Sequence, residues 1–89
     1  MTREGIIAAI EKHVSTYSVW RIGLTHDTKQ RKHEWEEELG KKITTWYDWE
    51  ANSLSDAQYI ENHFIKKGMD GGTGGDLSSY KTVYVYIFI

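Results

Sequence analysis

The stretch RIGLTHDTKQR, residues 21–31, changes character at its middle. Its first residues continue a β-branched and aromatic run over residues 17–24, which is typical of a strand. Thr25 and Asp27 then supply a turn and a helix cap, and a charged segment with no glycine or proline follows. The chain is therefore predicted to pass here from a strand directly into a helix, which ends at about residue 39 before a glycine.

The rest of the chain alternates in the same way. Isoleucines at helical spacing predict a first helix over residues 3–15, with Thr2 as its N-cap. Patterns of the same kind predict a strand over 43–49 and a helix from about 53 to 67, in which Ser55 and Gln58 have capping-box spacing. A glycine-rich loop over 68–76 and a strand over 81–89 complete the chain. The last strand is apolar on both faces, which suits the centre of a sheet. We expect an α+β fold of order α-β-α-β-α-β, with a three-stranded antiparallel sheet flanked by helices.

Length and composition limit which kinds of site this chain can contain. The 89 residues are enough for a single domain, spanning 1–89. The chain has no cysteine, which excludes disulfides, thiolate zinc sites and cysteine nucleophiles, and fits a reducing, cytoplasmic location. No apolar run approaches the ~20 residues that span a bilayer, so we expect no contact with a membrane. The net charge of −2 means that any nucleic-acid site must be a local patch.

The second predicted helix carries its charges in an unusual order. Lys29, Arg31 and Lys32 lie in its N-terminal half, and glutamates crowd its C-terminal half. The helix dipole favours the reverse arrangement by roughly 0.3–1 kcal/mol per charge. Cations and free N–H groups at a helix start make a strong anion site. Two interpretations stay open, an anion site and an ordinary solvated surface helix.

With the strand, glycine, turn and arginine in place, residues 18–67 resemble the GIY-YIG endonuclease family. Ile22-Gly23, Thr25 and Arg31 fall at the spacings of the second half of that family's motif. Ala57 and Glu61 then match the helix on which the family carries a glutamate. The resemblance implies hydrolysis of phosphodiester bonds in DNA with Mg²⁺ or Mn²⁺.

The sequence departs from the family in two places. Arg21 stands where the family has the tyrosine of Tyr-Ile-Gly, and an amphipathic helix precedes this strand where the family has its Gly-Ile-Tyr strand. The remaining tyrosine-bearing strand is at the C-terminus. A circular permutation would explain this order, with the missing strand appended through the glycine loop. Ile89 would then end near Thr16 or Tyr17.

Roles follow from the resemblance position by position. Arg31 would bind the phosphate, Glu61 would hold the metal, and Tyr84 and Tyr86 are candidate general bases on one face of the last strand. The substrate-binding candidates are Arg21, Gly23, Thr25, Lys29 and Lys32. The tyrosines could equally be ordinary strand packing, and Glu61 a solvated carboxylate.

The alternative function is a catalytically inactive relative that binds protein or nucleic acid. Aromatic side chains that we expect to be exposed favour it, since such clusters often anchor interfaces; they are Trp35, Trp46, Tyr47 and Trp49. The glycine-rich loop lacks the lysine and Ser/Thr of a P-loop and follows a helix, so it is interpreted as a connection.

Overall fold

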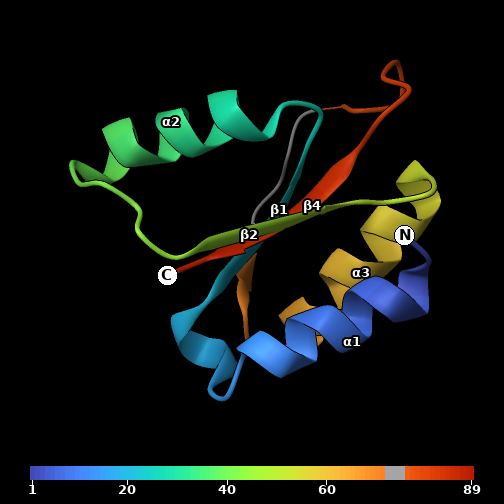
Figure 1. Ribbon diagram of the computed structural model, residues 1–89, viewed down its shortest axis with the longest axis horizontal. Helices are drawn as coiled ribbons and strands as arrows, with labels where there is room; N and C mark the ends of the chain where they lie inside the picture. Colours follow the sequence, from blue (N-terminus) through green and yellow to red (C-terminus); the bar gives the residue numbers. More distant parts are fainter. Residues whose placement is uncertain (72–75) are drawn as a thin grey trace.

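The computed structural model describes residues 1–71 and 76–89, and these form an α+β fold of three helices and a four-stranded mixed sheet (Figure 1). The helices and strands alternate as predicted, with one strand more. In chain order they are α1 (Arg3–His13), a short 3₁₀ helix (Tyr17–Val19), β1 (Arg21–Thr25), α2 (Thr28–Leu39), β2 (Trp46–Glu50), α3 (Leu54–Lys66), β3 (Asp70–Gly71) and β4 (Tyr84–Phe88).

The strand order in the sheet is β2-β4-β1-β3. The C-terminal strand β4 lies between β2 and β1 and is antiparallel to both, so the prediction of a central strand is confirmed. The prediction of a three-stranded antiparallel sheet is wrong in one respect, because β3 adds a fourth strand parallel to β1. This strand falls inside the segment predicted to be a loop. Asp70 pairs with Arg21 of β1, and its amide donates to the carbonyl of Trp20, the residue before the strand. Residues 72–75 of the predicted loop lie outside the described residues.

Alternation along β4 creates two hydrophobic clusters, one on each face of the sheet. Val85 and Ile87 are fully buried in the larger cluster, beneath α1 and α3. Tyr86 and Phe88 point to the opposite face and pack with Ile43 and two tryptophans beside α2. Figure 1 shows this arrangement, with α2 on one side of the sheet and α1 and α3 on the other.

Side-chain hydrogen bonds show which residues cap the helices, and two predicted details differ from the structure. Thr2 caps α1 as predicted, accepting from the Gly5 amide at 3.0 Å, and Asp27 caps α2, accepting from the Gln30 amide at 3.1 Å. The predicted Ser55 capping box is wrong, because the side chain of Ser53 caps α3 and Ser55 lies within the helix. The first predicted strand begins too early, since its first residues form the 3₁₀ helix instead.

The end of β4 lies beside the start of β1. Phe88 is opposite Arg21, so the last residue of β4 and the first residue of β1 are neighbours. The amide of Ile89 itself bonds to the carbonyl of Thr45, on the other neighbouring segment. In the described part of the chain no helix is long and apolar enough to cross a membrane.

Candidate functional site

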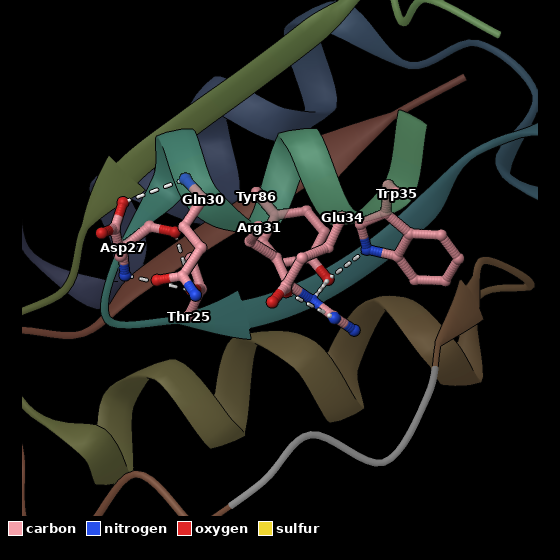
Figure 2. Close-up of polar contacts among 7 residues, drawn as sticks. All are labelled: Thr25, Asp27, Gln30, Arg31, Glu34, Trp35 and Tyr86. Atoms are coloured by element: carbon pink, nitrogen blue, oxygen red, sulfur yellow. Dashed lines mark hydrogen bonds and ion pairs between the residues drawn. The ribbon is translucent and has the colours of Figure 1, made fainter. Parts of the chain in front are cut away.

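A buried tyrosine hydroxyl joins two side chains of α2 to the central strand. The Tyr86 hydroxyl accepts a hydrogen bond from Arg31 Nε at 3.3 Å and from Trp35 Nε1 at 2.9 Å (Figure 2). Arg31 and Trp35 are four residues apart, so both point from one face of the helix toward the sheet. The sequence analysis predicted that Tyr86 and Arg31 belong to the same site, and in the structure the two side chains are in direct contact.

The arginine keeps donors free beyond this contact. Its Nη1 pairs with Glu34 at 3.1 Å, and about a third of the side chain is exposed. Burial would lower the pKa of Arg31, but hydrogen bonds and charge interactions with Tyr86 and Glu34 outweigh burial and raise it. The guanidinium therefore stays charged at any physiological pH and can contact an anion from solvent.

Gly23 makes room for the tyrosine. It lies opposite Tyr86 on β1, and a Cβ atom built at this glycine would overlap the phenol ring and hydroxyl of Tyr86. The ring is also fixed from its other side by Trp46, stacked at 4.6 Å between ring centroids and 7° from parallel. Gly23 was predicted to bind substrate, and its visible role is to let Tyr86 lie across β1 toward α2.

Arg21 lies on the same face of β1 and converges on the same tryptophan. Its guanidinium carbon is 4.6 Å from the centroid of the Trp35 ring, and that of Arg31 is 5.1 Å from it. Arg21 also pairs with Asp70 of β3 at 3.2 Å. Two half-exposed cations therefore share one indole, and each already has a carboxylate partner.

The remaining predicted substrate residues lie at the start of α2. Thr25 is buried, and its hydroxyl exchanges hydrogen bonds with the backbone of Asp27, both at 3.1 Å, which fixes the turn into the helix. Lys29 is exposed and Lys32 half-buried on the first turns of α2. Later in the helix His33 Nε2 lies 3.1 Å from a carboxylate oxygen of Glu37, a contact that is an ion pair only when the imidazole is protonated.

Tyr84 does not join the hydrogen-bonded group. It lies half-buried on β4 between Thr25 and Glu50 of the neighbouring strands, on the same face as Tyr86. Of the two candidate bases, only Tyr86 contacts Arg31.

Glu61 lies on α3, which packs against the opposite face of the sheet from α2. Ile65, one helical turn later, reaches the β3 strand, since a Cβ atom on Gly71 would overlap its side chain. Partial burial raises the pKa of Glu61 to about 6, and no charged neighbour contributes to the shift.

The donor set for a metal is sparse. Within residues 1–71 and 76–89, no group of three or more His, Asp or Glu side chains could hold an ion. One half-buried carboxylate fits only a hard cation such as Mg²⁺, which keeps several of its waters and binds few protein ligands. Glu61 is the residue that would hold it.

Sequence reasoning missed the place of Trp35, which was grouped with exposed aromatics. Only Tyr47 of that group is exposed, at 36%, whereas Trp35, Trp46 and Trp49 are half-buried. The spacing of Trp35 four residues after Arg31 was the available signal, because it places the two side chains on one face of a helix.

Comparisons with protein-family models, with curated proteins and with solved structures give no significant match to this chain.

Proposed function

We propose that this chain is a divergent, circularly permuted GIY-YIG-like domain that hydrolyses phosphodiester bonds in DNA with Mg²⁺ or Mn²⁺. The observation that carries the proposal is the contact of Arg31 with Tyr86. The resemblance assigns a phosphate-binding arginine and a tyrosine base to one site, although the two residues are 55 positions apart in this sequence. Their convergence on α2 and the central strand is what a permuted domain of this family requires.

The chemistry would use three groups. The free donors of Arg31 bind the phosphate and stabilise the charge that develops on it. The Tyr86 oxygen, which accepts N–H donors from Arg31 and Trp35 and is fixed by them, takes the role of general base that the resemblance assigns to a tyrosine. The resemblance gives Glu61 the divalent cation, which would supply Lewis-acid stabilisation of the leaving oxygen. Glu61 is on α3, against the opposite face of the sheet from Arg31 and Tyr86, so it does not share their face and is the weakest part of the assignment.

A catalytically inactive binding domain is the second candidate. The side chain that would act as base, Tyr86, is only 2% exposed, stacked on Trp46 and covered by α2. The two arginines of the site are also paired with Asp70 and Glu34. This packing is what an arginine and a tyrosine with purely structural roles would show.

A nicking experiment separates the two candidates. The parent protein and its Arg31→Lys, Tyr86→Phe and Glu61→Gln variants are incubated with supercoiled plasmid and with branched DNA, in Mn²⁺ or in EDTA. The matched control is Glu38→Gln, which removes the same charge from an exposed position on α2. Nicking by the parent and the control that requires metal and is lost in the three variants supports the endonuclease.

Other outcomes lead elsewhere. Folded parent protein that binds DNA without cutting it supports the inactive DNA-binding domain, and neither binding nor cutting points to a protein partner. Cytoplasmic location is part of the proposal, and microscopy of the tagged chain in cells checks it.

A further inference from the structure

The outer edge of β2 carries free backbone groups. Thr45 and Ala51 flank β2 and bond to the residues that flank β4: the Thr45 carbonyl accepts from the Ile89 amide, and the Ala51 amide donates to the Val83 carbonyl. In an antiparallel ladder every second residue faces the same neighbour, so Tyr47 and Trp49 also face β4. Trp46, Asp48 and Glu50 therefore direct their amides and carbonyls away from the sheet, where no other described strand pairs with them.

One end of this edge is closed. The Met1 nitrogen donates to the Glu50 carbonyl at 3.0 Å, which occupies an outward-facing acceptor. The segment from Trp46 to Asp48 stays accessible, and in Figure 1 β2 lies in front of the other strands with no helix drawn across it. Unprotected edges of this kind pair readily with another strand.

The side chains of β2 indicate which strand would pair with this edge. We propose that a second copy of this chain pairs with β2 in antiparallel fashion about a two-fold axis through Tyr47. This register places Trp46 of each copy opposite Asp48 of the other. The Trp46 indole donates to the Asp48 carboxylate at 2.7 Å within one chain, and in this register the same N–H can exchange that acceptor for the Asp48 carboxylate of the other copy.

The two neighbouring registers toward Glu50 are unfavourable. An axis through Asp48 would place two aspartates opposite each other, and an axis through Trp49 would place Asp48 opposite Glu50; like charges in such positions destabilise a sheet. The latter register also needs the Glu50 carbonyl that Met1 occupies. The Tyr47-centred register has neither defect, and it brings together two exposed Tyr47 rings, each stacked on His13 of its own chain at 3.8 Å.

The dimer joins two four-stranded sheets into one continuous sheet. Four backbone hydrogen bonds connect the copies, from the amides and carbonyls of Trp46 and Asp48 in each. The interface uses the same patch on both copies, so assembly closes at two and does not propagate.

Substitution at Asp48 tests the backbone pairing. Asp48→Pro removes an outward-facing amide and leaves all bonds to β4, which is the setting in which an edge strand accepts proline. Asp48→Ala loses the same carboxylate but keeps the amide. By analytical ultracentrifugation, the mass of the parent should rise with concentration from 10.4 kDa toward twice that value, and Asp48→Ala should show the same rise at higher concentration because it lacks the carboxylate opposite Trp46. Asp48→Pro should stay at 10.4 kDa.

A cysteine scan tests the register, since the chain has no cysteine of its own. Residues opposite each other at a non-hydrogen-bonded position are about 4.5 Å apart between Cα atoms, within disulfide range. Tyr47→Cys should therefore oxidise to a covalent dimer, and Thr45→Cys, on the same face but displaced along the strand, should not.

Three results would overturn the proposal: a parent that stays monomeric at every concentration, a folded Asp48→Pro variant that dimerises like the parent, or equal oxidation of the two cysteine variants. If circular dichroism shows that Asp48→Pro is unfolded, hydrogen exchange of the parent decides. The Trp46 and Asp48 amides should then exchange more slowly as concentration rises, and exchange that is independent of concentration contradicts the dimer. All of these readouts are independent of nuclease activity.

Discussion

At the scale of single residues, the site is a set of side chains that constrain one another. Tyr86 occupies the space that Gly23 leaves open, accepts hydrogen bonds from two residues of α2 and stacks on Trp46. A change at any of these positions therefore alters the others, which is why variants of the site must be checked for folding before loss of activity is interpreted.

Glu61 gives a prediction about pH. Its pKa is raised by burial from 4.5 in the unfolded chain to about 6 in the folded protein, so between these values the folded state binds more protons. The contribution of Glu61 to the free energy of unfolding thus decreases as pH rises from about 4.5 through 6. Glu61→Gln should be more stable than the parent at pH 7.5, by less than about 1 kcal/mol because the carboxylate is partly solvated.

Urea denaturation of both proteins at pH 4.5 and 7.5 measures this difference, with Glu38→Gln as the exposed control that should change little. If Glu61→Gln is no more stable than the parent at pH 7.5, this result contradicts a raised pKa of Glu61 in the folded protein. If Glu61 also holds the cation, Mn²⁺ should stabilise the parent and leave the variant unchanged.

At the scale of elements, α2 shows a conflict between stability and charge. Its first turn contains Lys29 and no acidic residue, and its last turn contains no basic residue. Asp27 offsets the conflict as N-cap, and the ion pair of Arg31 with Glu34 offsets more of it. These contacts do not compensate the charge of Lys29 on the first turn. An anionic ligand would be favoured there.

Lys29→Glu tests whether that cation serves binding. A carboxylate at this end of the helix should increase the free energy of unfolding by roughly 0.3–1 kcal/mol at low salt. DNA retention should weaken at the same time, with a shallower dependence on salt. Lys41→Glu makes the same charge change just after α2, at the negative end of the dipole, and should lower stability instead. Unchanged DNA affinity in Lys29→Glu would mean that the cations of α2 face only solvent.

Much of the element order could be predicted from the sequence, because each helix and strand has its own local signal. Apolar spacing predicted α1 and α3, and the apolar β4 was placed at the centre of the sheet since both of its faces had to be buried. The two-residue β3 has no such signal, because its pairing with β1 depends on where α3 delivers the chain. For the same reason the contact of Arg31 with Tyr86 could be expected only from a family resemblance, and the contribution of Trp35 was missed.

At the scale of the whole molecule, β4 couples the two faces of the sheet. Ile87 is part of the cluster beneath α1 and α3, and Phe88, the next residue, is part of the cluster beneath α2. Neither cluster can lose its packing without disturbing the strand that holds the other. We therefore expect the described parts of the chain to unfold as one cooperative unit.

Tryptophan fluorescence allows unfolding to be followed separately on each face of the sheet. Trp35 and Trp46 report on the α2 face, and Trp20 and Trp49 pack with the opposite cluster, so replacing either pair by phenylalanine leaves a reporter for one face. Phe88→Leu and Ile87→Val each remove packing from one face and should lower the free energy of unfolding by about 0.5–2 kcal/mol. In both variants the two fluorescence transitions and the circular dichroism transition should share one midpoint. If Phe88→Leu shifted only the α2-face signal, α2 would be a separate unit that docks onto a stable sheet, and the site built around Tyr86 would open without global unfolding.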